Sequence, residues 1–516
     1  MRKNYIFYIV LFLAGLMTFG CEKYLAELPQ NKLKPTSTDD YNQILNYAYL
    51  SESIMPYLDF LADDCKLYPE LRTSAMTTVI TGDRVLGAYL WYNSHEETMP
   101  TGDIAFRKLY ESIFYTNVVI DNIDNALGVE MSETNVRRTR NNIKGEAFAL
   151  RAYSYFYLIN LYGKYFNPAT ASEDMGVPIN LSSGVADKPY KRNTVKEVYD
   201  QMVEDLITGI KLMEENPLPK IDKIKFTPLA AKAMLARVYL YMHEWDRAIE
   251  QASAVIRENN AIFSLYEAGE QPIGVFTEVI GTPVGSLYAG LENGYCWGTD
   301  YLSINNPNVI LINGLNENLP CMSWYQSLTA FGVNPELADQ FEPNDVRRNY
   351  FMYTHTQTLS SVARTKLTYG KHRAQGMTLV GMQFAISRES GFTRVIRTEE
   401  MYLILAEANA HKNNMNAAVD YLNQLREPKF KRGTYTPLVA SNFNQQSLFD
   451  YVALERRREL CFEGHRWFDL RRTTRPAMQH EGYSGGGTLR QDDPRYVLQI
   501  PMRELSANPQ IGFAPR

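Results

Sequence analysis

Apolar residues recur every three to four positions along much of the chain, and this spacing predicts amphipathic helices. The most regular stretches give helices over residues 103–127, 133–162, 194–214, 398–411 and 416–426. Boundary signals support them. Thr194 and Glu197 have the spacing of a capping box, and Gly163 follows the second helix as a C-terminal cap. The protein is therefore predicted to be mainly α-helical.

Two helical hairpins stand out within this pattern. Thr227-Pro228 places proline at the first position of a helix whose small residues, Ala230 to Ala236, allow a close neighbour. Glu244-Trp245 then opens a partner helix, and the pair resembles a tetratricopeptide hairpin. The helices at 398–411 and 416–426 form a comparable pair. Because the pairs do not recur at a fixed period of about 34 residues, we expect an interrupted helical repeat.

Three long insertions separate the helical segments, which form a predicted scaffold over about 103–258 and 398–472. The insertions cover about 54–100, 260–334 and 350–394, and they are rich in Gly, Pro, Tyr and Trp. Strand-like pieces within them are short, as at 379–386. Loops of this length on a rigid scaffold are usually functional or disordered, and their aromatic content argues against disorder. We predict one domain over 40–516, with tetratricopeptide-like hairpins overlaid by long irregular loops.

The N-terminus predicts export. Arg2 and Lys3 precede an apolar run, residues 5–17, that is too short to span a bilayer of about 30 Å. Such a run is typical of a cleaved signal peptide, residues 1–20. Thr18-Phe19-Gly20-Cys21 resembles a bacterial lipobox, although Thr18 stands where Leu is usual, and it predicts lipidation of Cys21. An ordinary signal peptide with an incidental cysteine is the alternative. Residues 21–39 then form a polar tether.

Charge and cysteine content exclude several classes of protein. Without Arg2 and Lys3 the chain carries 51 basic and 58 acidic residues, so it has no basic footprint for nucleic acid. No later stretch has 18 consecutive apolar residues, and we expect no membrane span. Cys65, Cys296, Cys321 and Cys461 form no CxxC pair. Two alternatives remain for these cysteines: a disulfide between Cys296 and Cys321, or free thiols buried in the core. Cys461 is expected in the core.

The densest charge cluster lies at residues 455–471. Glu459 and Glu463 are four positions apart and would share a helix face, so they are candidates for an acid–base pair in glycoside hydrolysis. Arginines crowd the same segment, at positions 456, 457, 458 and 466. Guanidinium groups keep carboxylates ionised, which suits an ion-pair network better than catalysis. We therefore expect no catalytic residues here and a structural network instead.

Other candidate motifs are weaker. Residues 482–486 fit G-x-S-x-G, but the flanking residues lack the strand-to-helix context of a nucleophile elbow, which favours a glycine-rich loop. His95-Glu96-Glu97 is not a zinc motif, because Pro100 interrupts the helix that such a motif requires. Asp63-Asp64 remains a candidate for a structural calcium ion, without an oxygen-rich loop around it. No cofactor and no metal ligand is predicted.

Aromatic clusters in the insertions are the candidate ligand site. Sugar rings stack on flat aromatic faces, and their hydroxyls need planar polar partners. The predicted ligand-binding residues are Trp91, Tyr92, Asn93, Tyr295, Trp297 and Trp324. Tyr and Trp contribute large contact area at low entropic cost. The alternative is that these rings pack the insertions onto the scaffold. Tyr153, Tyr155 and Tyr157 lie in a predicted helix and are expected in the core.

Four segments together resemble the SusD/RagB family of outer-membrane lipoproteins from Bacteroidetes. They are 145–163 (GEAFALRAY through LYG), the hairpin at 230–249, 455–471 (ERRREL followed by FEGHRWFDLR), and the C-terminal 500–509 (IP, EL and NP). Segment 455–471 is the most specific of the four. With the lipobox they span the chain in the family's order.

This resemblance implies a function that composition alone does not show. It implies a lipid-anchored protein, exposed on the cell surface at the outer membrane, that binds oligosaccharide and acts as the lid of a SusC-like TonB-dependent transporter. Some members would bind peptide instead. In such a family the ligand site is expected on loops near the first and central insertions. A lipid-anchored glycoside hydrolase and a purely structural lid without a ligand are the competing hypotheses.

Overall fold

The fold is described from a computed structural model of the chain. It describes residues 35–49, 54–71, 84–99, 101–128, 131–184, 189–219, 223–265, 276–279, 302, 306–313, 330–359, 362–369, 371, 378–380, 383–385 and 394–514. Only the backbone is described at 276–279, 313, 353–359, 368–369, 378–380, 383–385 and 394.

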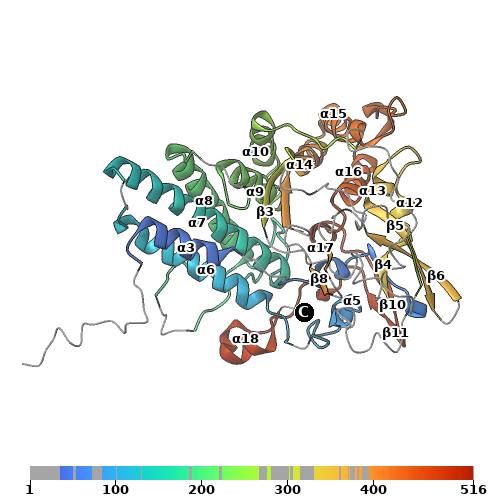
Figure 1. The fold of residues 1–516 in the computed structure, drawn as a ribbon, viewed down its shortest axis with the longest axis horizontal. Helices are drawn as coiled ribbons and strands as arrows, with labels where there is room; N and C mark the ends of the chain where they lie inside the picture. The colour runs from blue at the N-terminus through green and yellow to red at the C-terminus, as the bar shows by residue number, and fades with distance from the viewer. Residues whose placement is uncertain are drawn as a thin grey trace, which may run out of the picture.

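The architecture is mainly helical, as predicted. The helices are α3 (Thr38–Ala48), α5 (Leu86–Tyr89), α6 (Ala105–Asn122), α7 (Glu133–Tyr162), α8 (Val195–Glu215), α9 (Pro228–Tyr241), α10 (Trp245–Glu258), α12 (Pro335–Asp339), α13 (Arg347–Phe351), α14 (Thr398–His411), α15 (Met415–Arg426), α16 (Gln445–Leu460), α17 (Arg466–Arg472) and α18 (Met502–Ala507). Helices α3 and α6 to α10 lie on one side of the molecule, and most of the strands lie on the other, near α16 (Figure 1).

The long helices pack in sequence order and form a row of hairpins. Helix α7 packs against α6 and α8, α9 packs against α8 and α10, and α14 packs against α15 and α16. Helix α10 also packs directly against α14, although the second and third insertions lie between them in the chain. The prediction of an interrupted helical repeat is therefore confirmed, because the row continues across the interruption.

Small residues set the spacing of these helices, as the alanine run predicts. Ala230, Ala231, Ala233 and Ala236 of α9 are all fully buried. At the crossing of α7 and α8, a Cβ added to Gly209 would lie 2.6 Å from the backbone oxygen of Gly145. Gly163 does follow α7, but its φ of −101° is not the left-handed cap. The site is tight for a side chain, because a Cβ would lie 3.0 Å from the Ile159 carbonyl oxygen and 3.2 Å from Gly176 Cα.

The strands form small separate sheets in the insertions and near the C-terminus. They are β1 (Cys65–Leu67), β2 (Phe276–Val279), β3 (Val309–Asn313), β4 (Phe331–Val333), β5 (Met352–Leu359), β6 (Val362–Tyr369), β7 (Thr378–Val380), β8 (Gln383–Ala385), β9 (Arg394–Arg397), β10 (Met478–Gly482) and β11 (Gly485–Leu489). The antiparallel pairs are β1–β4, β3–β9, β7–β8 and β10–β11, and β2 pairs in parallel with the β5–β6 hairpin.

Several sequence expectations need adjustment here. The third insertion contains the eight-residue strands β5 and β6, where only short pieces such as 379–386 were predicted. Alternating threonines at 354, 356 and 358 carry the β-strand signal that composition alone misses. Helix α3 begins at Thr38, inside the predicted tether, and is capped by a reciprocal pair, Ser37 and Asp40. Tyr153, Tyr155 and Tyr157 are buried core residues, as expected, and so is the free thiol Cys461.

We predict that Gly209→Ala lowers the free energy of unfolding. Alanine has the higher helix propensity by about 1 kcal/mol. The added methyl group would press on the Gly145 carbonyl, and a backbone atom cannot rotate away. We expect a net loss of about 1–3 kcal/mol from overpacking, measured by urea unfolding followed by circular dichroism.

The matched control is Gly184→Ala, because Gly184 is exposed in a loop and its Cβ would meet only the Ser182 hydroxyl. An unchanged or raised stability for Gly209→Ala would show that the two helices can separate without cost.

Candidate ligand region and its ion-pair frame

A buried row of carboxylates runs along the end of α16. Glu455 and Glu459 lie on the helix, and Glu463 lies in the turn that follows it, because α16 ends at Leu460. The expectation that Glu459 and Glu463 share a helix face is therefore wrong in detail, although their carboxylates do converge. All three side chains are buried.

The cations that meet these carboxylates come from distant parts of the chain. Arg347, at the start of α13, places Nη1 2.8 Å from Glu459 and Nη2 2.7 Å from Glu455. Arg397, at the end of β9, donates from Nη1 to Glu459 at 2.7 Å and from Nη2 to Glu463 at 2.8 Å. Lys371 of the third insertion donates to Glu463 as well. We call these six residues the α16 charge network.

The network holds its carboxylates in the ionised form. Burial alone would raise the pKa of Glu459, but the charges of Lys429, Arg397 and Arg347 outweigh it and hold that pKa well below its usual range. Burial would likewise raise the pKa of Glu463, but the charges of Arg397 and Lys371 lower it to about 2. A general acid needs a raised pKa, so this pair does not suit acid–base catalysis.

The arginines of the same segment have other partners than the sequence suggests. Only Arg458 of the four contacts a carboxylate of the network, Glu455, at 3.2 Å. The others make separate pairs: Arg456 with Asp469 (3.2 Å), Arg457 with Asp64 (2.7 Å) and Arg466 with Asp63 (2.7 Å). The prediction of a structural ion-pair network is confirmed, but its partners lie far along the chain.

The Asp63-Asp64 pair is thus occupied by guanidinium groups. Arg466 binds both oxygens of Asp63, at 2.7 and 2.8 Å. This arrangement fixes the first insertion to α17 and does not favour the calcium site considered above. Within the described residues, no group of three His, Cys, Asp or Glu side chains is placed to hold a metal ion.

The first aromatic cluster forms a rigid corner beside α5. Trp91 has a positive φ of 51°, and its indole Nε1 donates to the Leu61 carbonyl at 2.9 Å. His480 of β10 stacks between Trp91 and Tyr89, with ring centroids 4.1 and 4.2 Å away. Burial lowers the pKa of His480 to about 4, so the imidazole is neutral at pH 7. Arg495 donates to the Trp91 carbonyl at 2.9 Å.

Of the three residues predicted to bind ligand at this corner, Trp91 is buried, whereas Tyr92 and Asn93 are exposed. The Trp91 side chain is only 2% exposed and packs the insertion against β10, as the packing alternative proposed. Tyr92 is 38% exposed, and Asn93 is exposed beside it. The Tyr92 amide donates to the Gly87 carbonyl at 2.8 Å, which fixes the backbone of the corner. The accessible part of this cluster is therefore Tyr92 with Asn93. Tyr295, Trp297 and Trp324, together with Cys21, Cys296 and Cys321, lie outside the described residues.

The G-x-S-x-G segment forms neither a nucleophile elbow nor an irregular loop. It is the turn of the β10–β11 hairpin, with Gly482 paired to Gly485. A strand follows the serine, where a nucleophile elbow would have a helix. A Cβ at Gly487 would lie 2.3 Å from the Leu90 carbonyl, so this glycine lets the hairpin pack against the corner that carries Tyr92.

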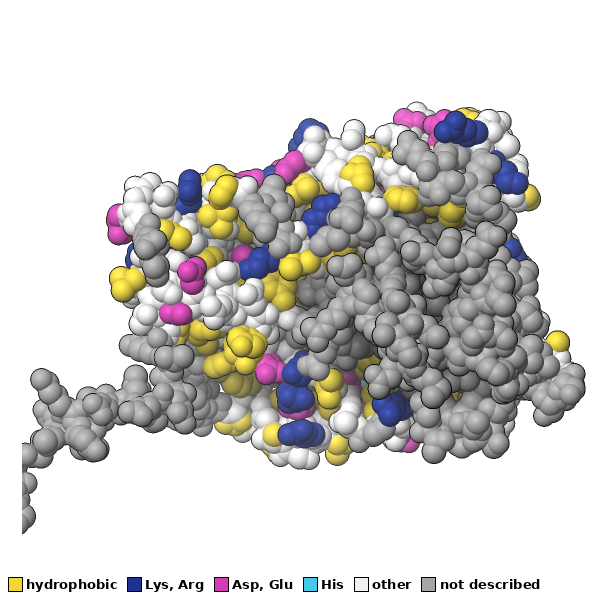
Figure 2. Space-filling model, viewed as in Figure 1, with side chains coloured by type: hydrophobic (Ala, Val, Ile, Leu, Met, Phe, Trp, Pro, Cys, Tyr) yellow, Lys and Arg dark blue, Asp and Glu magenta, His cyan; other side chains and the backbone are white. Residues whose placement is uncertain are grey.

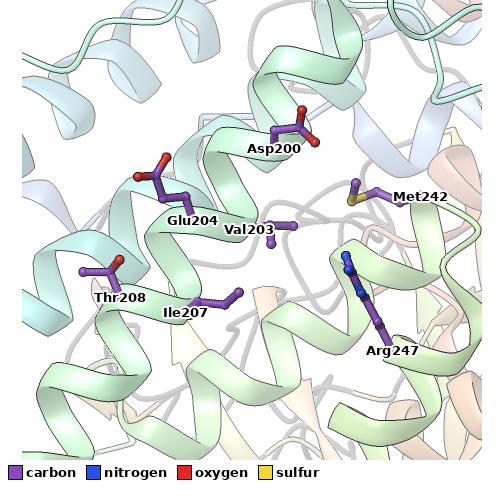
Figure 3. A pocket seen from close by; sticks show the side chains of 7 residues that line it. All are labelled: Asp200, Val203, Glu204, Ile207, Thr208, Met242 and Arg247. Carbon is purple, nitrogen blue, oxygen red and sulfur yellow. The ribbon is translucent and has the colours of Figure 1, made fainter.

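The scaffold also carries an open groove of about 360 Å³ (Figure 3). Val203 and Ile207 of α8 point toward Met242 and Arg247 on the α9–α10 hairpin. Acidic, basic and hydrophobic side chains are interspersed over the visible face of the scaffold (Figure 2). Among the described helices, none combines the length and the apolar character that crossing a bilayer requires.

The fold is that of a tetratricopeptide-like scaffold protein. Its helical hairpins form a row, and buried ion pairs hold the irregular insertions against them. Two family models match this chain. One, described as starch-binding and associating with the outer membrane, matches residues 23–240, and one described as the SusD family matches residues 344–512. The chain belongs to the SusD/RagB family, as its sequence motifs suggested.

Relatives and solved structures agree with this assignment. One SusD-like protein of Formosa agariphila is 26% identical, over 71% of this chain and 72% of its own length. Another from the same organism is 22% identical, over 99% of this chain and 97% of its own length. A SusD-like carbohydrate-binding protein from Bacteroides vulgatus is 22% identical, with a TM-score of 0.65 over 92% of this chain and 98% of that one. A SusD superfamily protein from Bacteroides thetaiotaomicron gives 0.67 at 21% identity, over 93% and 100%.

We predict that Glu459→Gln destabilises the protein strongly at pH 7. The variant leaves Arg347 and Arg397 buried with one carboxylate fewer, which costs about 3–5 kcal/mol. Asp450→Asn on the exposed face of α16 is the control, and it should change stability by no more than about 0.5 kcal/mol. Urea unfolding measures both, and a Glu459→Gln protein as stable as the wild type would contradict the network's role.

The same network predicts how stability depends on acid. A carboxylate whose pKa is lower in the folded than in the unfolded protein stabilises the fold at any pH above its unfolded pKa. This contribution is lost as the pH falls from the unfolded pKa through the folded pKa. For Glu463 the window runs from its ordinary pKa of 4.5 down to about 2. Glu459→Gln should flatten the loss of unfolding free energy across this window, and an unchanged slope would contradict the assignment.

Proposed function

We propose that this chain is a surface-exposed lipoprotein of the outer membrane, anchored through Cys21, that binds oligosaccharide and passes it to a SusC-like TonB-dependent transporter. It would act as the lid of that transporter, with 40–516 as one binding domain. Binding would be reversible and would need no cofactor and no covalent step.

The observation that carries this proposal is the exposed Tyr92-Asn93 pair on a rigid corner. The stacked rings of Tyr89, His480 and Trp91 hold that corner before any ligand arrives. A half-exposed phenol ring offers a face for a sugar ring, and an amide can both donate to and accept from neighbouring hydroxyls. Because the backbone is already fixed, little conformational entropy is lost on binding.

Relatives support the ligand class. The family description names starch binding at the outer membrane, and one solved relative is a laminarin-binding SusD-like protein, with a TM-score of 0.58 at 21% identity over 93% of this chain and all of that one. We extend this class to the present chain, with Tyr295, Trp297 and Trp324 as further proposed contacts. A peptide ligand at the same loops is the alternative.

Hydrolysis is the less favoured hypothesis, and the α16 charge network is the reason. Glu459 and Glu463 are buried and are bound by Arg397, and their pKa values are held low. A hydrolase of this family fold would need its acid and base elsewhere. Release of reducing ends from a polysaccharide by the purified protein would overturn the proposal of a non-catalytic binder.

We predict that Tyr92→Ala weakens oligosaccharide binding about tenfold, because one stacking face worth about 1.4 kcal/mol is removed. Isothermal titration of the purified protein with malto- and laminari-oligosaccharides measures the affinity. Phe114→Ala is the matched control, since Phe114 is a comparably exposed ring on the scaffold helix α6 and should leave affinity unchanged.

Two results would contradict this account. Equal affinities for Tyr92→Ala and the wild type would remove the corner from the site. Heat with peptides and none with any glycan would move the ligand class to peptide.

A further inference from the structure

A cleft of about 670 Å³ opens among the scaffold helices, and Asp63 of the first insertion also lines it. Its walls come from the start of α10, the end of α14, the outer face of α16, and α17 with the residues after it. This volume lies within the range of ligand pockets, roughly 300–1,000 Å³. No part of the loop-based proposal uses these residues.

Four flat side chains line one wall as a continuous stack. Trp245 lies between His243 and His411, with ring centroids 5.0 and 3.9 Å away and planes within 14° and 4° of parallel. Phe449 of α16 continues the stack, 4.4 Å from His411. His243 lies in the turn before α10 and has a positive φ of 61°. Three separate helical segments thus build one aromatic wall, and His411 in its middle remains exposed.

The floor of the cleft holds a buried guanidinium with an unused donor. Arg456 is only 2% exposed, and its Nε and Nη2 each lie 3.2 Å from the carboxylate of Asp469. Its Nη1 has no hydrogen-bond partner among the described residues. A buried N–H without an acceptor costs about 1–3 kcal/mol. An acceptor oxygen supplied by a ligand in the cleft would remove that cost.

The charges around Arg456 argue against an anion as that ligand. Asp469 and Glu407 already face Arg456 and Arg472, with Arg472 Nη2 2.8 Å from both Asp469 and Glu407. Burial, with smaller contributions from nearby Arg472, lowers the pKa of both His243 and His411, so neither imidazole brings a positive charge at pH 7. Four arginines and four carboxylates line the cleft in all, so it has no net positive charge that would favour an anion over a neutral ligand.

We propose that this cleft is a second ligand site and that it takes a neutral, hydroxyl-rich ligand such as an uncharged sugar unit. One ligand oxygen accepts from Arg456 Nη1, and the apolar face of the ring lies along the wall formed by Trp245, His411 and Phe449. Neutral imidazoles and the exposed Gln446 offer further donors and acceptors to hydroxyls. The site shares its ligand class with the proposed function, but it rests on different residues and can fail separately.

The five tryptophans allow one experiment to separate the two sites. In the full chain labelled with ¹⁵N-tryptophan, the indole signal of Trp245 reports on the cleft. Trp91, Trp297 and Trp324 report on the loops, and the fully buried Trp467 serves as the internal control. The probes are maltohexaose and laminarihexaose, titrated into the millimolar range, with oligogalacturonate as the anionic comparison.

We expect a saturable shift of the Trp245 signal with at least one neutral probe, while the Trp467 signal stays fixed. If the loop tryptophans respond and Trp245 does not, the second site is overturned and the proposed function stands. If only Trp245 responds, the loop assignment fails instead. A Trp245 shift with oligogalacturonate alone overturns the neutral ligand class, and no Trp245 shift with any probe overturns the site.

Two variants test the contacts. Arg456→Lys keeps a cation for Asp469 but removes the free Nη1 donor, and we expect the affinity at Trp245 to fall about tenfold. Phe449→Ala shortens the aromatic wall and should have a similar effect, whereas Phe114→Ala on α6 should have none. Thermal melting checks that each variant is folded. If Arg456→Lys and Phe449→Ala fold and bind as tightly as the wild type, the proposal is wrong.

Discussion

Buried charges that must be paired are the constraint on which the structure depends. Glu455, Glu459 and Glu463 lie without contact to solvent, and an unpaired carboxylate in such a place would be strongly destabilising. Each carboxylate therefore requires a cation, and the sequence supplies these cations from α13, the third insertion and the end of β9. Arg347 and Glu459 are 112 residues apart. Pairing over such separations fixes where the insertions lie on the helical row.

The same principle operates along the scaffold. Arg237 of α9 binds both oxygens of Glu400 on α14, at 2.6 Å each. Arg151 of α7 binds both oxygens of Asp205 on α8, at 2.8 and 2.6 Å. Bidentate pairs are directional, so each one selects a register between its helices as well as a distance. Apolar packing brings the helices together, and these pairs set how they are aligned.

A frame held in this way suits reversible binding. Among the described residues, those proposed to meet ligand lie at a corner of the first insertion and along a cleft between helices. Both places are rigid, and neither depends on the residues of the α16 charge network. Because the carboxylates of that network are kept ionised and enclosed, they stabilise the protein and are not available to react. The proposed ligand contacts are instead aromatic rings and polar side chains that lie outside this network.

Local patterns predicted the helical part of this structure well. Helix α7 covers the residues expected for it, and the Thr194–Glu197 capping box forms as expected, because both depend on neighbours within one turn. Cys461 in the core follows from the same local pattern. The family assignment likewise came from motifs that lie within single segments.

Features that depend on distant contacts were not predictable. The acidic and basic character of 455–471 indicated a network, but no local rule pairs Glu459 with Arg347. Trp91 and Tyr92 are adjacent and alike in sequence, yet one is buried under His480 and the other is exposed. His480 lies 389 positions after Trp91, so only the folded chain reveals this difference. The stack of Trp245 with His411 and Phe449 has the same origin.

Hydrogen–deuterium exchange of Glu463→Gln against the wild type tests the role of the charge network most directly. Glu463 binds Arg397 and Lys371, so its loss should deprotect β9 and the third insertion near residue 371 together with the end of α16. The account predicts that α7 and α8 keep their protection in the same sample. Deprotection confined to α16, or spread evenly over the whole chain, would contradict the claim that these buried charges fix the insertions to the helices.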